Sequence, residues 1–349
     1  MAESPTALAP MPRPRRPRID LRAFQRLTEL ADYFVPFTIR AVCELGVADL
    51  LAAGPRHVDD LAARTQTHGP SLYRALRALA CKGIFTEVGK RTFALTPLAE
   101  LLREDHPLSL RDAYHLMPAD VAAWARMDHS LRTGEPAFDA VHGEHLWDFL
   151  ERRPDEGKRF DRGMQAMTRA ELRALTAAYD WGSLGTVVDV GGGNGAFLAG
   201  LLARHPALRG VLLDLPHAVR EAPRILEAAG VAERCEVVPG SFFDAIPRTG
   251  GAYVLKRIVY GWDDERALAL LRAVRAAMDP GSVVLVLEPV AGDAEGDDFG
   301  AILDVVMLVV DGGRSRSVQE LRALFAAADL ELTCVQPTMT FPIVAGRPA

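Results

Sequence analysis

The sequence predicts an α/β unit with a mostly parallel sheet in its C-terminal half, preceded by a mainly helical winged-helix unit. Three observations support this fold class. Amphipathic helices open the chain, a helix-turn-helix pattern with a hairpin follows, and short β-branched runs alternate with helices after Trp181. The 349 residues are enough for two units that each bury a hydrophobic core.

The composition is that of an ordinary soluble enzyme, with 49% hydrophobic and 25% charged residues. A net charge of -6 argues against a nucleic-acid partner, because phosphate contacts need clustered Lys and Arg, and favours a small molecule. The four cysteines lie far apart, which predicts reduced thiols in a cytoplasmic protein and neither a zinc site nor a disulfide. No apolar run approaches the roughly 20 residues that span a bilayer, so no membrane segment is expected.

The N-terminal unit is expected over residues 19–105, after a disordered tail at 1–18 that consists largely of Pro, Ala and Arg. Between residues 24 and 51, apolar side chains recur at helical spacing and are interrupted at Pro36, which predicts two amphipathic helices. This apolar face is too long for a chain end that packs on nothing. We therefore expect it to pack against a second copy in a homodimer.

Residues 58–95 have the pattern of helix, turn, helix and two-stranded hairpin, which is typical of a winged helix. One interpretation is DNA binding by the helix at 71–79, which carries Arg74 and Arg77. The other is a structural module at a dimer interface. Two arginines on one helix are ordinary for a solvated surface, so the sequence favours the structural module.

Residues 106–180 are mostly helical and are expected to connect the two units and to roof a pocket. Met164 and Met167 lie at i and i+3, a spacing that suits core packing as well as a ligand surface. His142 and His145 are one turn apart, but no further His, Cys or carboxylate completes a metal site, so no metal is expected.

The α/β unit is expected over residues 181–349. Two apolar runs late in the chain have no helix between them, which predicts an antiparallel hairpin at the edge of the sheet, at 330–337 and 340–345. Five earlier β-branched runs, each followed by a helical or loop segment, predict parallel strands at 186–190, 210–213, 235–238, 252–255 and 283–287.

The first of these strands leads into a glycine-rich turn, where a ligand can approach backbone N–H groups closely. Gly191, Gly193 and Ala196 also satisfy the relaxed dinucleotide fingerprint G-x-G-x-x-G/A. Asp189 favours a ligand with a cationic amine, because its carboxylate would repel a pyrophosphate. Asp214 ends the next strand and is positioned for the ribose hydroxyls of either ligand.

With these motifs the chain resembles the class I S-adenosylmethionine-dependent small-molecule O-methyltransferases, typified by plant caffeate O-methyltransferases and by actinobacterial enzymes that tailor polyketides. The resemblance covers nearly the whole chain. It is carried by seven segments in family order, at 189–195, 214–216, 240–244, 255–258, 262–265, 288–290 and 312–314. It implies a Rossmann-like, seven-stranded domain with S-adenosylmethionine as cofactor, S-adenosylhomocysteine as product and no metal, a dimerising winged-helix domain, and a substrate pocket between the two.

The resemblance also implies roles for individual residues. The expected cofactor-binding residues are Thr168, Asp189, Gly191, Gly193, Asp214, Leu215, Ser241, Phe242 and Lys256. Of these, Ser241 replaces the usual Asp near the adenine, and Lys256 is expected to contribute through its backbone. The residues expected to contact the substrate are Met164, Trp262, Met307 and Asp311.

Two further positions, at the expected catalytic site, depart from the family pattern. Relatives carry a catalytic His where this chain has Tyr260, and two Glu residues that orient the His; Glu288 matches one of them, and Ser315 replaces the other. Tyr260 and Glu288 are therefore the candidate catalytic residues. A phenol has a pKa of about 10, and a carboxylate nearby raises it, so we expect Tyr260 to donate a hydrogen bond rather than to act as a base.

The sequence thus predicts methylation of a phenolic hydroxyl on a small aromatic intermediate, of polyketide type and orsellinic-acid-like, free or carrier-tethered. Transfer is expected to depend mainly on positioning, which supplies roughly 7–11 kcal/mol, whereas a general base supplies about 10²–10⁴ in rate. One alternative is an enzyme of the same fold diverted to hydroxylation, decarboxylation or cyclisation. A remote alternative is a winged-helix DNA-binding regulator, which the net acidity opposes.

Overall fold

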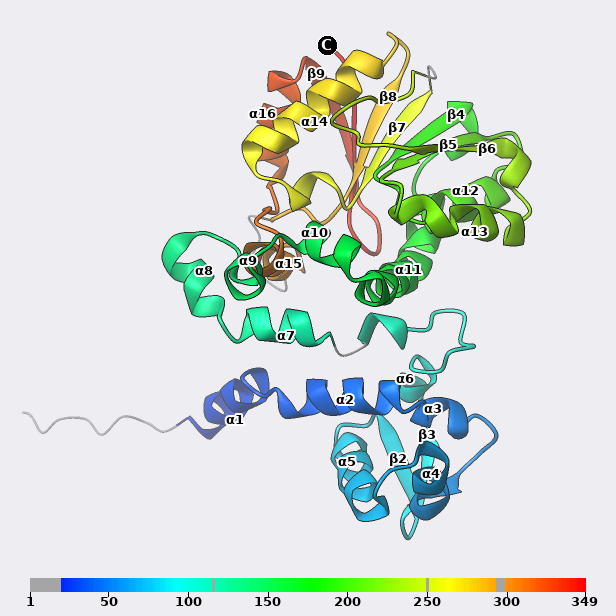
Figure 1. The fold of residues 1–349 in the computed structure, drawn as a ribbon, viewed down its shortest axis with the longest axis vertical. Helices are drawn as coiled ribbons and strands as arrows, with labels where there is room; N and C mark the ends of the chain where they lie inside the picture. The colour runs from blue at the N-terminus through cyan, green and yellow to red at the C-terminus, as the bar shows by residue number, and fades with distance from the viewer. Residues whose placement is uncertain (1–19, 115–116, 249–250, 293–298) are drawn as a thin grey trace, which may run out of the picture.

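The structure, a computed structural model, describes residues 20–114, 117–248, 251–292 and 299–349. The expected disordered tail at 1–18 lies outside these residues. Figure 1 shows three parts, with an N-terminal helical unit at the bottom, an α/β unit at the top and a layer of helices between them. The two units predicted from the sequence are therefore confirmed, and the helical layer lies where a pocket roof was expected.

The chain begins with two helices, but their boundary is not where the sequence analysis placed it. The break falls between Leu30 and Phe34, whereas Pro36 lies in the first turn of the second helix. A proline is tolerated there because the N–H groups of the first turn have no intrahelical partner. The helices are α1 (Leu21–Leu30), α2 (Phe34–Glu44) and α3 (Val47–Leu50).

The next elements form the predicted winged helix. Two helices pack on a small antiparallel sheet of strand order β1-β3-β2, around the buried side chains of Leu61, Leu76 and Phe93. The elements are β1 (Arg56–His57), α4 (Val58–Thr65), α5 (Gly69–Cys81), β2 (Phe85–Gly89) and β3 (Thr92–Leu95).

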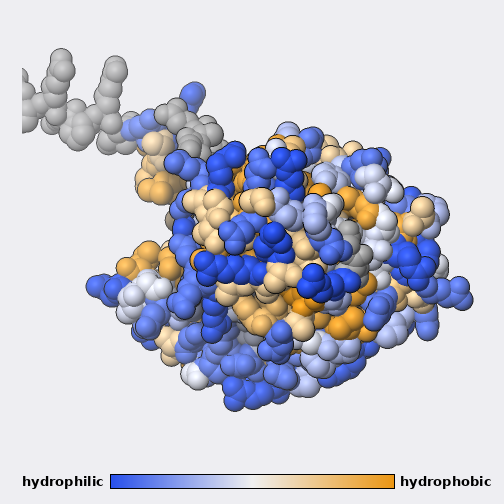
Figure 2. Space-filling model, turned by 90° about the horizontal axis from the view of Figure 1, so that it is seen from above, coloured by the Kyte–Doolittle hydropathy of each residue, from blue (hydrophilic) through white to orange (hydrophobic). Residues whose placement is uncertain are grey.

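One face of the first two helices is apolar and exposed in the single chain. Phe24 and Leu27 are each 68% exposed, and Tyr33 and Phe34 continue the same surface. Figure 2 shows orange, apolar atoms beside the grey N-terminal trace. An apolar surface of this extent indicates a partner.

The middle layer combines helices from both halves of the sequence. A cluster around Phe138 and Phe149 also contains Val309, so a helix from the C-terminal half packs into this layer (Figure 1). The elements are α6 (Pro97–Glu100), η1 (Asp112–Tyr114), α7 (Pro118–Trp124), α8 (Met127–Thr133), α9 (Ala137–His142), α10 (Leu146–Arg152), α11 (Pro154–Ala177) and α15 (Phe299–Val310).

The α/β unit contains a seven-stranded sheet of order β6-β5-β4-β7-β8-β10-β9. All seven predicted strands are confirmed, and the last two form the expected antiparallel hairpin at one edge of the sheet. Its second strand, β10, pairs with β8 and β9 and is antiparallel to both, so the edge strand β9 runs parallel to the others. The strands are β4 (Thr186–Val190), β5 (Arg209–Asp214), β6 (Cys235–Pro239), β7 (Ala252–Lys256), β8 (Val283–Leu287), β9 (Leu330–Gln336) and β10 (Ile343–Pro348).

Burial explains the order of the last two strands. Residues Ile343, Val344 and Ala345 are buried in succession, as in a strand covered on both faces, whereas β9 alternates between buried and exposed residues. The continuous apolar strand therefore takes the inner position and the alternating strand takes the edge.

Helices cover both faces of the sheet. One core lies between the sheet and α11, α12 and α13, and the other lies against α14 and α16 (Figure 1). No helix in the described part of the chain is long and apolar enough to cross a membrane. The remaining elements are η2 (Trp181–Leu184), α12 (Ala196–Arg204), η3 (Ala218–Glu221), α13 (Ala222–Ala228), η4 (Ala232–Arg234), η5 (Val259–Gly261), α14 (Asp264–Ala277) and α16 (Val318–Ala327).

Candidate active site

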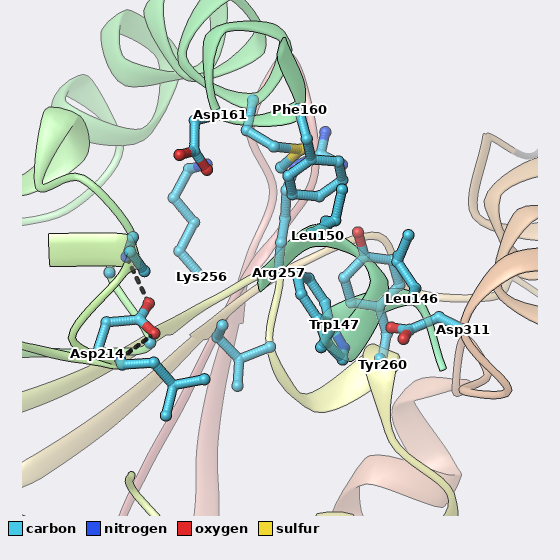
Figure 3. Close-up of a pocket in the computed structure, with 18 of the residues that line it drawn as sticks. Leu146, Trp147, Leu150, Phe160, Asp161, Asp214, Lys256, Arg257, Tyr260 and Asp311 are labelled. Atoms are coloured by element: carbon cyan, nitrogen blue, oxygen red, sulfur yellow. Dashed lines mark hydrogen bonds between the residues drawn. The ribbon is translucent and has the colours of Figure 1, made fainter. Parts of the chain in front are cut away.

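A cavity of about 940 Å³ lies between the carboxyl ends of the central strands and the helical layer (Figure 3). Turns after β4, β5 and β7 line it from below, and α10, α11 and α15 line it from the other side. Every residue expected to bind cofactor or substrate lines this cavity, as does Tyr260, whereas Glu288 does not. These lining residues are Met164, Thr168, Asp189, Gly191, Gly193, Asp214, Leu215, Ser241, Phe242, Lys256, Tyr260, Trp262, Met307 and Asp311.

Asp189 presents an unpaired carboxyl group to the cavity. It is 1% exposed, and neither carboxylate oxygen has a hydrogen-bond partner among the described residues. Burial raises its pKa to about 7. The adjacent turn requires glycine, because a Cβ at Gly192 would lie 2.5 Å from Asp189 Oδ2. The site therefore offers a buried acid, without a partner of its own, to a cationic group.

Asp214 shapes the same end of the cavity. Its Oδ2 accepts a hydrogen bond from the Gly193 N–H at 2.7 Å, and its Oδ1 accepts one from the Leu215 N–H at 2.6 Å. Burial raises the pKa of this carboxyl group, and the two N–H donors oppose the shift. Asp214 thus holds the glycine-rich turn in place while it faces the cavity.

Aromatic side chains form the third wall of this end. Phe242 and Phe243 lie with ring centroids 4.8 Å apart, and Trp262 packs edge-on against both rings. Ser241 accepts a hydrogen bond from the Phe243 N–H at 3.1 Å, which fixes the turn that carries the rings. Trp262, expected to contact the substrate, therefore lies beside the residues expected at the adenine.

One face of α11 joins the roof of the cavity to the sheet. Lys256 Nζ donates to Thr168 Oγ1 at 3.1 Å and lies 2.8 Å from Glu171 Oε2. Arg257, whose φ of 58° is unusual for a residue other than glycine, also pairs with Glu171. Lys256 was expected to act through its backbone; its buried side chain additionally ties the roof to the end of β7.

Tyr260 lies in the short helix η5 and is 6% exposed. Burial raises its pKa, and the charge and hydrogen bond of Arg257 oppose that shift without reversing it. Tyr260 is therefore a neutral phenol, as expected, although burial contributes more than the nearby Glu288. Because the phenol oxygen accepts from Arg257, its proton is available to a group in the cavity.

Glu288 supports the turn from behind. It is 1% exposed, its Oε2 accepts a hydrogen bond from the Tyr260 N–H at 3.1 Å, and burial raises its pKa to about 7. A Cβ at Gly313 would lie 2.2 Å from the Tyr260 carbonyl oxygen, so the loop after α15 packs directly on this turn. Arg316 donates to the carbonyls of Val259 and Trp262. These contacts make Glu288 a positioning residue.

Asp311 lies at the end of α15, close to Tyr260 (Figure 3). Trp147 donates a hydrogen bond to its carboxyl group, and Oδ1 has no hydrogen-bond partner in the described part of the chain. His145 Nε2 donates to the Asp311 carbonyl at 3.2 Å and lies 3.7 Å from Oδ1. Burial raises the pKa of Asp311 to about 6, and His145 opposes the shift.

Several lining or supporting residues were missed by the sequence analysis. Asp161 lines the cavity near Lys256, and burial raises its pKa to about 6 (Figure 3). Asp161 and Glu171 lie on the same face of α11 as the predicted Met164 and Thr168, at spacings of three and four residues. The sequence signal that could have identified Asp161 and Glu171 is their helical spacing from Met164 and Thr168. Nothing in the sequence alone connects Trp147 with Asp311, which lies 164 residues away.

No group of three or more His, Cys, Asp or Glu residues suited to a metal ion occurs among the residues that the structure describes. The Nε2 atoms of both histidines have protein partners. His142 Nε2 hydrogen-bonds the Ala119 carbonyl, and His145 Nε2 hydrogen-bonds the Asp311 carbonyl.

Family models identify both parts of the chain. Residues 124–331 match an O-methyltransferase domain, and residues 28–105 match an O-methyltransferase dimerisation domain. The chain belongs to the O-methyltransferase family. The family expected from seven short segments is thus confirmed over most of the sequence, and so is the enzyme class.

Individual relatives of this O-methyltransferase cover nearly its full length. Phenazine O-methyltransferase PhzM of Lysobacter antibioticus is 37% identical over 92% of this chain and 95% of that protein. The neocarzinostatin O-methyltransferase NcsB1, crystallised with S-adenosylmethionine and 2-hydroxy-5-methyl naphthoic acid, superposes with a TM-score of 0.79 at 37% identity, covering 95% and 99% of the two chains. Aclacinomycin 10-hydroxylase RdmB of Streptomyces purpurascens is 35% identical over 88% and 84%.

The unpaired Asp189 predicts a pH-dependent stability effect in the ligand-free O-methyltransferase. Its pKa is about 7 in the folded protein and about 3.8 when unfolded, so between these values the folded state binds more protons. Stability from this group is therefore lost as pH rises from about 4 to 7. Asp189→Asn removes that penalty and should raise the free energy of unfolding at pH 8 by about 1–3 kcal/mol, but not at pH 4.

Urea unfolding of dialysed protein at pH 4, 6 and 8 measures the effect. The exposed Asp244→Asn is the matched control for the loss of one carboxyl group. A loss of stability in Asp189→Asn at pH 8 would show that the carboxylate has a partner that favours its charged form.

Proposed function

We propose that this enzyme transfers the methyl group of S-adenosylmethionine to a phenolic hydroxyl of a small aromatic natural-product intermediate. One observation carries the proposal: a single cavity joins a glycine-rich turn with the unpaired buried Asp189 to an apolar chamber that ends at Tyr260 and Asp311. The first end suits a ligand with a cationic amine and a ribose. The second suits a flat ring with one polar substituent.

The residues at the first end fit S-adenosylmethionine. Asp189 offers an unpaired carboxyl group to the ammonium of the methionine part, and the turn at Gly191 and Gly193 lets the backbone approach it. Asp214 would accept from the ribose hydroxyls. Phe242 and Trp262 provide aromatic faces for the adenine, so in this proposal Trp262 belongs to the cofactor rather than to the acceptor. The cofactor supplies a methyl group on a positively charged sulfur.

The second end fits an aromatic acceptor. Its walls are almost entirely apolar, which favours a planar ring and excludes water from the reacting hydroxyl. The lining here comprises Phe138, Leu146, Trp147, Leu150, Phe160, Met164, Leu303, Val306, Met307 and Val310. Two relatives, a phenazine O-methyltransferase and an O-methyltransferase crystallised with a naphthoic acid, support an acceptor of this class.

The reaction requires that a hydroxyl oxygen face the methyl group along the line of the bond that breaks. Met164 and Met307 flank the acceptor and Tyr260 donates a hydrogen bond to it, so the chain supplies alignment and a dry environment. Such alignment is worth roughly 7–11 kcal/mol.

Tyr260 also supports a second candidate function. Because the usual base is missing, the cofactor and cavity could serve hydroxylation, as the name of the relative aclacinomycin 10-hydroxylase RdmB states for that protein. Hydroxylation would need dioxygen as the oxidant and two electrons from a reductant. Incubation under air with a thiol reductant, S-adenosylmethionine labelled in its methyl group and a panel of phenols and naphthols therefore separates the two. A labelled product heavier by one methylene supports methylation, and an unlabelled product heavier by one oxygen would replace the proposal with the hydroxylase.

Two copies are proposed to assemble through α1 and α2, where Phe24 and Leu27 are exposed in the single chain. The match of residues 28–105 to a dimerisation domain supports this arrangement. Phe24→Asp combined with Leu27→Asp should convert a dimer to a monomer, because two charges would be buried at the interface. Sedimentation velocity measures the mass, with the exposed Arg26→Asp as control. A double variant that stays dimeric would place the interface elsewhere.

Asp214→Ala should weaken S-adenosylhomocysteine binding by roughly 2–4 kcal/mol, because it removes charge-assisted hydrogen bonds to the ribose and to the turn at Gly193. Calorimetric titration measures the change. The control is Asp311→Asn, at the other end of the cavity. Its affinity for S-adenosylhomocysteine should equal that of the parent. An unchanged affinity in Asp214→Ala would contradict the proposed position of the cofactor.

Tyr260→Phe should keep the single-turnover rate within about tenfold of the parent, since a neutral hydrogen bond is worth about 0.5–1.5 kcal/mol. Tyr260→Ala should lose about 10² or more, because it removes the ring that positions the acceptor. The rates are measured against pH. A loss above a thousandfold in Tyr260→Phe, together with the disappearance of a pH-dependent step, would make Tyr260 the base and refute its role as a donor.

A further inference from the structure

The reacting hydroxyl must lose a proton, and the position where relatives carry a histidine is occupied here by a neutral phenol. Six acidic residues line the cavity, namely Asp120, Asp161, Asp189, Asp214, Glu265 and Asp311. Of these, Asp311 is the acid whose charge acts on Tyr260. Glu288 also acts on Tyr260, but it lies outside the lining and accepts from the Tyr260 N–H.

We propose that Asp311 is the general base, which removes the proton from the acceptor hydroxyl; this inference rests on the methyltransferase function proposed above. The carboxyl group has room at this place because residue 261 is glycine, where a Cβ would lie 3.0 Å from Asp311 Oδ2. Oδ2 therefore lies beside the turn that carries Tyr260. The Asp311 carboxyl group lies beside the side chain of Tyr260, and both residues line the cavity (Figure 3).

The carboxyl group of Asp311 is under-satisfied for its depth. An ionised carboxylate has about four acceptor sites, whereas Trp147 is the one side chain in the described residues that donates to it, and Oδ1 has no hydrogen-bond partner. A buried acid with a purely structural role is normally saturated with donors. Asp311 therefore retains acceptor capacity for a hydroxyl group that enters the cavity.

The surroundings of Asp311 set its proton affinity. His145 lies 3.7 Å from Oδ1 and lowers the pKa, Trp147 lowers it through its hydrogen bond, and Asp139 behind His145 raises it. Tyr260 faces the carboxyl group as a neutral phenol. Burial outweighs the rest and brings the pKa to about 6, near the value at which a base is most effective at neutral pH.

The hydroxyl proton moves to the Asp311 carboxylate while the oxygen uses a lone pair to bond the methyl carbon, and the electron pair of the broken carbon–sulfur bond stays on sulfur. The products are a methyl ether, a neutral thioether and a protonated Asp311, which returns its proton to solvent when the cavity opens.

Single-turnover methylation of 6-substituted 2-naphthols of decreasing pKa tests the inference. Asp311→Asn, which keeps size and one acceptor, should lose about 10²–10⁴ in rate with 2-naphthol. The loss should shrink as the naphthol becomes more acidic and disappear for one that is already ionised at the assay pH. In the parent, the rate should rise through about pH 6 and then level, and this rise should be absent in Asp311→Asn.

Two matched variants separate base catalysis from a structural effect. Asp120→Asn changes a half-buried acid of the same cavity and should lower all naphthol rates by one similar factor below ten. His145→Gln should move the rise in the pH profile to higher pH, because His145 lowers the pKa of Asp311. His142→Gln, one turn away, should leave the pH profile in place.

Binding of 2-naphthol in the presence of S-adenosylhomocysteine, followed by naphthol fluorescence, provides a readout independent of turnover, and Asp311→Asn should bind it within a few-fold of the parent. An Asp311→Asn rate within tenfold of the parent, or an equal loss for all naphthols, overturns the inference while the proposed function stands. A parent that methylates no naphthol or phenol overturns the proposed function, and the inference falls with it.

Discussion

The position of the cavity roof depends on one buried acid, Glu171. Its carboxylate pairs with both Lys256 and Arg257, so one residue of α11 is shared by two cationic side chains at the end of β7. The three side chains are between 3% and 8% exposed. Removal of one partner from a buried ion pair typically destabilises by about 3–5 kcal/mol, and here two cations would be left unpaired. The faces of α11 that carry Met164 and Thr168 are therefore fixed over the sheet by charge.

The buried polar groups of the molecule fall into two kinds. Arg316 and Glu171 are surrounded by partners and hold elements together. Asp189 and Asp311 carry oxygens without hydrogen-bond partners among the described residues, and both line the cavity, at opposite ends. A buried polar atom without a partner is destabilising unless a ligand supplies one. Among the described residues, oxygens of Asp139, Glu156 and Ser315 also have no hydrogen-bond partner, but only Asp189 and Asp311 combine such an oxygen with a place in the cavity lining.

Much of the fold follows from local signals in the sequence. The alternation of β-branched runs and helices placed all seven strands, because parallel strands buried on both faces need continuous apolar runs. The position of β10 inside the sheet was missed, although the unbroken run Ile343, Val344 and Ala345 indicates a doubly covered strand. The break before Phe34 was misplaced because a proline in a first helical turn looks like an interruption.

The candidate site was only partly predictable, for a different reason. Residues next to the glycine-rich turn are close in sequence to the motif that identifies them, so Asp189 and Asp214 were found. The acceptor end is assembled from α10, α15 and η5, which are far apart in sequence and meet through packing. No local pattern relates Trp147 and His145 to Asp311.

The structure also relates the two departures from the family pattern, at Tyr260 and at Ser315, to each other. Ser315 is 4% exposed and its Oγ has no hydrogen-bond partner in the described chain, while Glu288 is already engaged with the Tyr260 N–H. A histidine at 260 would therefore find only one of the two acids that orient it in relatives, because Ser315 replaces the other. Gly261 instead leaves space for the Asp311 carboxyl group beside the same turn. In the proposed mechanism the proton acceptor therefore lies at the end of α15 instead of in η5, and Tyr260 in η5 positions the substrate.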